Sequence, residues 1–131
     1  MRRLILLAAA LMFAMPVLAQ VPGGPADRKF VVFFQSWSGE LDDSAVSVIA
    51  DVATIAKANP TRKVIIHGFA DPTGTARANS LVSALRAELV ANQLVADGVS
   101  ADRIVQDAMG ATDFAMSSQE SRRVTIGLES N

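Results

Sequence analysis

Few side chains in this chain of 131 residues could take part in chemistry. The chain has one histidine, no cysteine and no tyrosine, and its acidic residues are scattered rather than paired on one face. His67 lies inside an apolar segment, without a second histidine or a cysteine to join it, so we interpret it as a structural strand residue rather than as a ligand or general base. The sequence therefore predicts neither an enzyme nor a protein that holds a metal or another cofactor.

The most informative segment, residues 68–87, joins a predicted strand to a predicted helix. Asp71 follows the strand in an Asp-Pro-x-Gly turn at the rim of the sheet, and the first amides of the helix face the same rim. Arg86 follows about two turns further along the helix. A carboxylate can bind an ammonium group, and a guanidinium with helix amides can bind a carboxylate. Asp71 and Arg86 could thus hold the zwitterionic end of an amino acid.

Each of these residues also has an ordinary structural interpretation. Asp71 could simply open its turn, Asn79 could cap the helix or lie in its first turn, and Arg86 could be a solvated helix residue. An intact binding cup would favour a ligand-binding module. An Asp71 that bonds within its own turn would favour a scaffold that binds another protein.

The spacing in this segment resembles the pattern of OmpA-like, peptidoglycan-binding domains. That pattern is G-x-x-D-x-x-G, then Asn, then L-S-x-x-R-A and Val, and the matching positions here are Gly68, Asp71, Gly74, Asn79, Ser83, Arg86, Ala87 and Val90. The likeness continues through residues 95–99 and 103–104 to 121–124, which is similar to N-R-R-V, and it covers residues 31–128. The chain departs from the usual pattern at Phe69, Ala70, Val82 and Ser121.

The resemblance implies a domain that binds peptidoglycan non-covalently through the diaminopimelate residue of the wall peptide. Asp71 would hold the free amino group of that residue and Arg86 its carboxylate. The other positions implied to line or support the pocket are Asn79, Gly74, Thr75, Arg122, Arg123, Gln35 and Trp37. Trp37, the only tryptophan, could also be buried under its loop. The alternative function is an OmpA-like scaffold that binds another envelope protein and not the wall.

The hydrophobic pattern predicts the elements that position these residues. Strands are predicted at 30–34, 63–69, 103–106 and 123–128, with helices from Asp42 or Asp43 to Asn59 and at 77–96. Gly98 occupies the position of a left-handed helix cap. Because residues 30–34 are continuously apolar, that strand is expected to be central or covered on both faces. The order of elements predicts an α+β two-layer sandwich, with a mixed four-stranded sheet covered on one face by two main helices.

The N-terminal segment predicts export. Arg2 and Arg3 precede an apolar run at residues 4–18, which is typical of a signal peptide cleaved after Ala19 and is too short to remain as a membrane span. A flexible leader is expected at 20–28 and one domain at 29–131. The mature chain would carry 10 basic against 13 acidic residues, a balance that argues against nucleic-acid binding. We expect a periplasmic protein of a Gram-negative bacterium, associated with the outer membrane or the cell wall.

Overall fold

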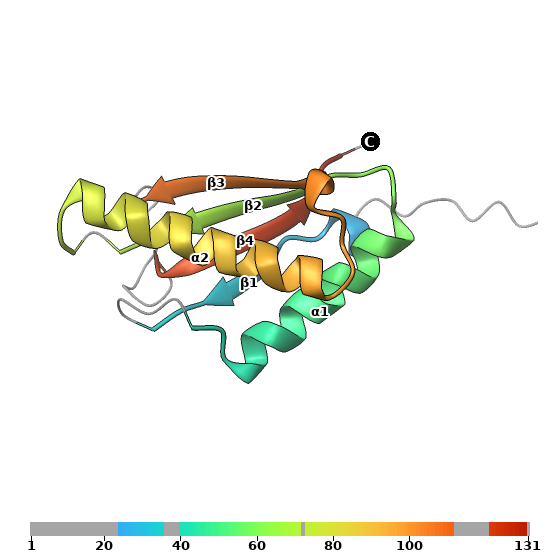
Figure 1. The fold of residues 1–131 in the computed structure, drawn as a ribbon, viewed down its shortest axis with the longest axis horizontal. Coiled ribbons are helices and arrows are strands. Elements are labelled where there is room, and N and C mark those ends of the chain that lie inside the picture. Colours follow the sequence, from blue (N-terminus) through green and yellow to red (C-terminus); the bar gives the residue numbers. More distant parts are fainter. Residues whose placement is uncertain (1–23, 36–39, 72, 112–120, 131) are drawn as a thin grey trace, which may run out of the picture.

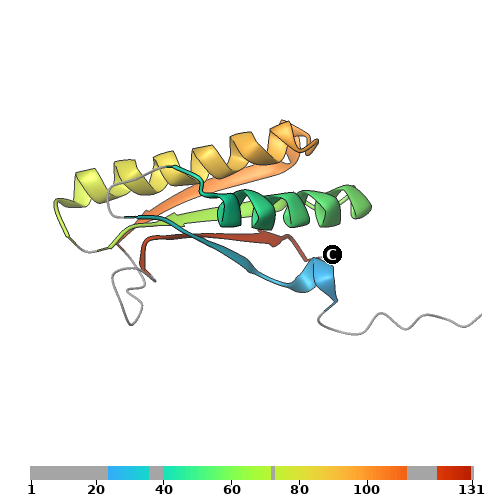
Figure 2. The same ribbon diagram turned by 90° about the horizontal axis from the view of Figure 1, so that it is seen from below.

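The computed structural model describes residues 24–35, 40–71, 73–111 and 121–130. Its four strands form one mixed sheet in the order β1-β4-β2-β3, with the bounds β1 Phe30–Phe33, β2 Val64–Phe69, β3 Ile104–Gly110 and β4 Arg123–Leu128. β2 and β3 are parallel, and β4 is antiparallel to both β1 and β2. The helices α1 (Asp43–Ala58) and α2 (Ala76–Ala96) lie on the same side of the sheet (Figures 1 and 2). The predicted α+β sandwich is confirmed.

Local hydrogen bonds fix the ends of both helices. The Asp42 carboxylate accepts a bond of 2.7 Å from the amide of Ala45 and caps α1, and the Thr75 hydroxyl accepts one of 3.1 Å from Ala78 and caps α2. At the end of α2, Gly98 has a φ of +100°. The amides of Gly98 and Val99 bond back to the last turn of the helix, which is the Schellman arrangement that favours glycine.

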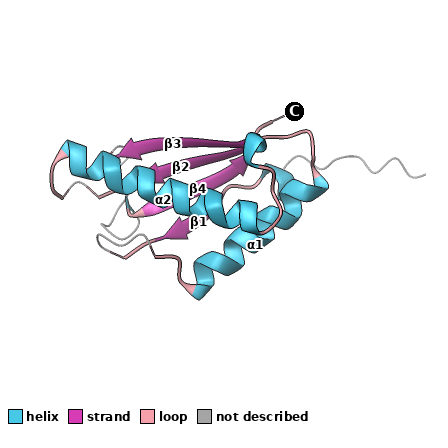
Figure 3. Cartoon of the chain, in the orientation of Figure 1, coloured by secondary structure: helices cyan, strands magenta, loops and turns pink. Residues whose placement is uncertain are grey.

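The hydrophobic core lies between the sheet and the two helices, which Figure 2 shows as two layers and Figure 3 colours magenta and cyan. The alternation of β4 places Val124 and Ile126 in this core, where both are fully buried. Further apolar side chains with 0% exposure come from both helices and from β2: Ile49, Val52, Ala56, Val64, Ile66, Val90 and Leu94. None of the described helices is both long and apolar enough to cross a membrane.

The position of β1 differs from the prediction. β1 lies at the edge of the sheet, and β4 is its only partner among the described strands. Val32 and Phe34 are buried in the core, whereas 37% of Val31 and 47% of Phe33 is exposed. A continuously apolar sequence is typical of a covered strand, but at this edge only the face toward α1 is covered.

The buried face of α2 also differs from the prediction. The apolar residues of the predicted helix at 77–96 predict a buried arc made of Val82, Leu85, Leu89, Val90 and Leu94. Leu85 is nevertheless 49% exposed, while Ser83 and Arg86 are buried. The cause is the close approach of α2 to β2, where a Cβ added at Gly68 would lie 2.1 Å from the Ser83 carbonyl oxygen. Only small residues or a side chain that extends along the interface fit there.

Ordered packing begins before the predicted start of the domain at Lys29. Residues Pro25–Asp27, expected in the flexible leader, form a 3-10 helix (η1) that contacts β4 and α1. The Asp27 carboxylate forms an ion pair of 3.0 Å with Arg62. The predicted signal peptide at 1–19 lies outside the described residues.

Candidate functional site

The candidate site lies where β2 ends and α2 begins. The arrowheads of β2 and β3 and the first turn of α2 lie at the same end of the molecule (Figure 1). Asp71 follows β2 and is 7% exposed, and Arg86, in the middle of α2, is 1% exposed. Buried charged groups need partners because burial removes their hydration, so the contacts of these two side chains define the site.

Asp71 is bonded on one side within its own turn and on the other to a distant arginine. Its Oδ1 accepts from the backbone amide of Thr73 at 3.3 Å and from the Thr73 hydroxyl. Its Oδ2 accepts from Nη1 of Arg122 at 3.0 Å. The turn contact is the one that the structural interpretation of Asp71 predicted, but the ion pair with Arg122 is an additional contact.

These partners determine the pKa of Asp71. Burial acts to raise the pKa of the carboxyl group, but the hydrogen bonds from Thr73 and Arg122 and the positive charge of Arg122 outweigh it, and the pKa falls below its ordinary value. The group is therefore an anion at neutral pH and remains available to a cation.

Arg86 is not the solvated helix residue of the structural interpretation. Its Nη2 donates to the Gln35 carbonyl at 3.0 Å and its Nη1 to the Phe69 carbonyl at 3.4 Å. Its guanidinium carbon lies 5.2 Å from the centre of the Phe34 ring. Burial and the nearby charge of Arg122 lower the pKa of Arg86, while Asp71 opposes this shift. Arg86 thus connects α2 to the ends of β1 and β2.

The two arginines of the Arg-Arg-Val segment lie in different surroundings. Arg122 donates from Nε to the Phe34 carbonyl at 3.1 Å and pairs with Asp71, so it belongs to the site. Arg123 stacks on the Phe69 ring with its guanidinium carbon 4.0 Å from the ring centre. Because successive strand residues point to opposite faces, Arg123 lies on the sheet face away from the helices. His67 lines the same groove as Arg123 and is half-buried, as a structural strand residue should be.

The remaining predicted residues surround this cluster at the start of α2. Asn79 is buried in the first turn of the helix, and Gly74 and Thr75 are exposed just before it. Gly74 has a φ of +88°, which a glycine adopts without strain. The Gln35 side chain is exposed, and Gln35 contributes to the site through its backbone carbonyl, which accepts from Arg86. Trp37 lies outside the described residues.

Two contributions to the site were not predicted from the sequence. One is Phe34, whose carbonyl binds Arg122 and whose ring faces Arg86. The other is Ser83, whose hydroxyl accepts from the Gly110 amide at 3.1 Å and so joins α2 to the end of β3. No sequence motif marks an acceptor carbonyl, whereas Ser83 belongs to the matched family pattern. Within the described ranges, no three histidine or acidic side chains are grouped so that they could hold a metal ion.

Comparison with known proteins agrees with this architecture. Residues 33–124 match the OmpA family. The chain belongs to the OmpA family. Domains of this family are binding domains rather than enzymes. The membership accounts for the shared spacing of Gly68, Asp71 and Arg86 that the sequence displays.

The similar proteins support the same assignment. This OmpA-family chain is 34% identical over 93 residues to the peptidoglycan-binding protein ArfA of Mycobacterium tuberculosis, which covers 71% of this chain and 27% of ArfA. It is 32% identical over 103 residues to the probable lipoprotein YiaD of Escherichia coli, with 74% of this chain and 47% of YiaD covered. The chain thus spans less than half the length of these curated relatives. The solved structure of the peptidoglycan-associated lipoprotein from Burkholderia pseudomallei shares the fold, with a TM-score of 0.68 at 24% identity over 76% of this chain and 89% of that one.

Proposed function

We propose that this domain binds peptidoglycan non-covalently, through the diaminopimelate residue of the wall peptide. The observation that carries the proposal is that a buried carboxylate, Asp71, and a buried guanidinium, Arg86, lie close enough to act on each other electrostatically at the end of β2. The name of the ArfA relative supports the general partner. The chemistry of the two charges is what favours an amino acid that carries both an ammonium and a carboxylate group.

The charges of the cluster favour a ligand carboxylate. Among the residues that the structure describes, the cluster contains one anion, Asp71, and two cations, Arg86 and Arg122, and so has one more positive than negative charge. The amides at Gly74 and Thr75 precede the 21-residue helix α2, and its N-terminal dipole adds to the attraction for an anion. In the proposed complex Arg86 and these amides bind the ligand carboxylate, and the buried Asn79 lies in the same first turn.

Asp71 retains room for an ammonium group. An ionised carboxylate offers about four acceptor positions, and the described residues use three of them, two from Thr73 and one from Arg122. The remaining position on Oδ2 is proposed to accept from the ligand ammonium, with Arg122 holding the carboxylate in place. Because the groups are buried, the loss of one partner costs more than it would in an exposed ion pair.

One observation favours the second candidate, a scaffold that binds another envelope protein. Asp71 does bond within its own turn, through Thr73, as expected for a carboxylate with a purely structural role. The two candidates differ in whether the purified domain binds the wall.

Co-sedimentation with purified diaminopimelate-type peptidoglycan tests the proposal. Wild type should sediment with the wall, and Asp71→Asn and Arg86→Lys should remain in the supernatant, although both keep the shape of the side chain closely enough to fold. Asp107→Asn removes an exposed carboxylate of β3 and should bind like wild type. Circular dichroism checks that every variant is folded.

Each result of this assay decides between the candidates. If wild type does not sediment, or if folded Asp71→Asn and Arg86→Lys bind as well as Asp107→Asn, the scaffold replaces wall binding. A parallel assay with lysine-type peptidoglycan, whose peptide lacks the second carboxylate, tests the finer claim. Equal binding to both walls would leave peptidoglycan as the partner and exclude diaminopimelate as the group recognised.

The proposed setting is the periplasm, with residues 1–19 as a cleaved signal peptide and the domain anchored to the wall. The relative described as a probable lipoprotein is consistent with an envelope location. N-terminal sequencing of the exported protein should give Gln20 as its first residue. An N-terminus that retains residues 1–19 would contradict cleavage.

A further inference from the structure

The outer edge of β1 carries backbone groups that can pair with another strand. The amide of Phe34 donates to the Arg122 carbonyl at 2.9 Å, which fixes the hydrogen-bonded positions of the β1–β4 ladder. In an antiparallel ladder these positions alternate, so Val32 bonds toward β4 and the N–H and C=O groups of Val31 and Phe33 point away from it. Within the described ranges no other strand pairs with this edge, which is visible in Figure 1.

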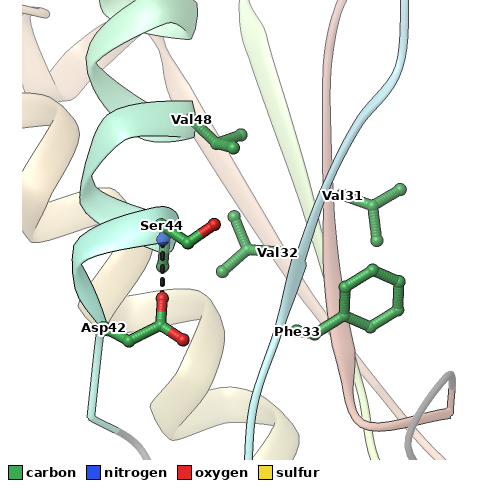
Figure 4. Close-up of a pocket in the computed structure, with 7 residues that line it drawn as sticks. Val31, Val32, Phe33, Asp42, Ser44 and Val48 are labelled. Carbon is green, nitrogen blue, oxygen red and sulfur yellow. Dashed lines mark hydrogen bonds between the residues drawn. The ribbon is translucent and has the colours of Figure 1, made fainter.

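The side chains of the same two residues are also exposed. Val31 is 37% and Phe33 47% exposed, and both lie on the sheet face opposite α1, because Val32 points toward the helix (Figure 4). Natural edge strands usually carry a lysine, a proline or another charge that prevents pairing. Residues 30–34 contain none of these. β1 is therefore an apolar edge without the usual protection.

Charges flank this edge in an order that selects its partner. Exposed Arg28 and Lys29 precede β1, and exposed Asp42 and Asp43 follow it at the start of α1. One shallow cavity between β1 and α1 is lined by Arg28, Phe30 and the exposed Asp51 of α1, and another by Asp42 on the α1 side of β1 and Phe33 on its far side (Figure 4). Arg28 and Lys29 outnumber Asp51, so the first end of the edge is basic. If a second copy paired with this edge in antiparallel orientation, the basic end of each β1 strand would lie beside the acidic end of the other. The edge is thus electrostatically complementary to itself.

We propose that two copies of this chain associate by antiparallel pairing of their β1 strands. Val31 of one copy lies opposite Phe33 of the second, because this register aligns the outward backbone groups of both strands. Their exposed side chains then become cross-strand neighbours on one face. The two sheets form one continuous sheet, and the contact is isologous, as expected for a two-fold dimer.

The dimer would present two candidate sites from one assembly. Phe34 and Gln35 directly follow β1, and their carbonyls hold Arg122 and Arg86. Pairing leaves these groups facing the interior, so the interface and the site do not compete. Two linked sites raise the avidity for a repetitive wall polymer without any new contact to it.

Sedimentation velocity tests whether the pairing occurs. The dimer fraction of the purified wild-type protein should rise as the concentration approaches the order of 100 µM, a range typical of small interfaces. Phe33→Lys places a charge in the middle of the interface and should remain monomeric. Leu81→Lys changes a side chain of α2 that is 62% exposed and should dimerise like wild type. A monomeric wild type, or a Phe33→Lys variant that dimerises equally, overturns the proposal.

Cysteine cross-linking tests the register. The chain has no cysteine, so Val31→Cys and Phe33→Cys can be made as two separate single variants and mixed. Opposed residues of a hydrogen-bonded pair have Cα atoms about 5.5 Å apart, which a disulfide spans. Mild oxidation of the mixture should give mainly the disulfide-linked heterodimer, distinguished by mass from the two homodimers. A mixture that forms no more heterodimer than homodimer contradicts antiparallel pairing in this register.

Discussion

The replacement of Gly68 by alanine should separate α2 from β2. The new Cβ would lie 2.1 Å from the Ser83 carbonyl oxygen, 3.0 Å from its carbonyl carbon and 3.3 Å from the Ala87 Cβ. Because real Cβ contacts do not fall below 3.0 Å, α2 would have to move by about 0.9 Å at this point. The obstacle is backbone, which cannot rotate away. Overpacking should therefore cost about 3 kcal/mol, near the upper end of its usual range.

Urea unfolding followed by circular dichroism measures this cost. For a domain of this size about 3 kcal/mol corresponds to a decrease in Tm of roughly 10–20 °C. Gly127→Ala is the matched control, since its Cβ would meet only the flexible Lys29 side chain, at 3.7 Å. That variant should unfold within about 0.5 kcal/mol of wild type. If Gly68→Ala is as stable as Gly127→Ala, the close approach of α2 to β2 does not exist in solution.

Two further substitutions test the charged contacts. The lowered pKa of Asp71 means that its stabilising charge is fully present above its unfolded pKa of about 3.9 and is lost as the pH falls through the folded value. Asp71→Asn should therefore have a free energy of unfolding about 1–3 kcal/mol lower than that of wild type at pH 7. The difference between the two proteins should decrease at pH 3. A difference that does not depend on pH would show that it does not come from the charge of Asp71. Arg103→Met should lower the free energy of unfolding by about 2–3 kcal/mol. Its guanidinium donates to carbonyls in the last turn of α1 and just after it, those of Ala56, Asn59 and Arg62. An unchanged urea midpoint, with exposed Lys63→Met as the control, would show that these bonds contribute nothing.

Features set by neighbouring residues could be predicted from the sequence. The cap at Asp42 and the turn at Gly98 depend on side-chain and backbone chemistry within a few residues. The alternation of β4 is likewise visible in the chain itself, and it places Val124 and Ile126 in the core. The order of these elements was then sufficient to predict the α+β sandwich, because few connections are compatible with it.

Features set by distant segments could not be predicted. The apolar content of β1 is the same whether the strand is central or at an edge, and only the pairing with β4 decides its position. On α2, Leu85 is the more hydrophobic side chain, yet Ser83 faces the sheet because Gly68 lets the two backbones approach. The distance between α2 and β2, which decides between Leu85 and Ser83, cannot be read from the sequence.

In the candidate site, too, contacts between sequence neighbours could be predicted and contacts between distant segments could not. The bond from Thr73 to Asp71 is local and follows from the turn sequence, whereas Arg122 is 51 positions from Asp71 and was indicated only by the family resemblance. The burial of Arg86 could not be predicted, because a charged residue in a helix is usually solvated. Its burial is possible only because carbonyl groups from two strand ends converge on it.

Backbone carbonyl groups at the end of β1 help to hold both arginines of the site. Arg122 bonds to the carbonyl of Phe34 and Arg86 to that of Gln35, so the position of the guanidinium groups depends on where β1 ends. A substitution of the exposed Gln35 side chain leaves its carbonyl in place, whereas the buried Phe34 side chain both anchors the end of β1 in the core and faces Arg86. The two positions, adjacent in sequence, thus differ in how far they constrain the site. Pairing of β1 with a second copy would restrict the same strand end, and through it the geometry in which Arg86 and Asp71 meet a ligand.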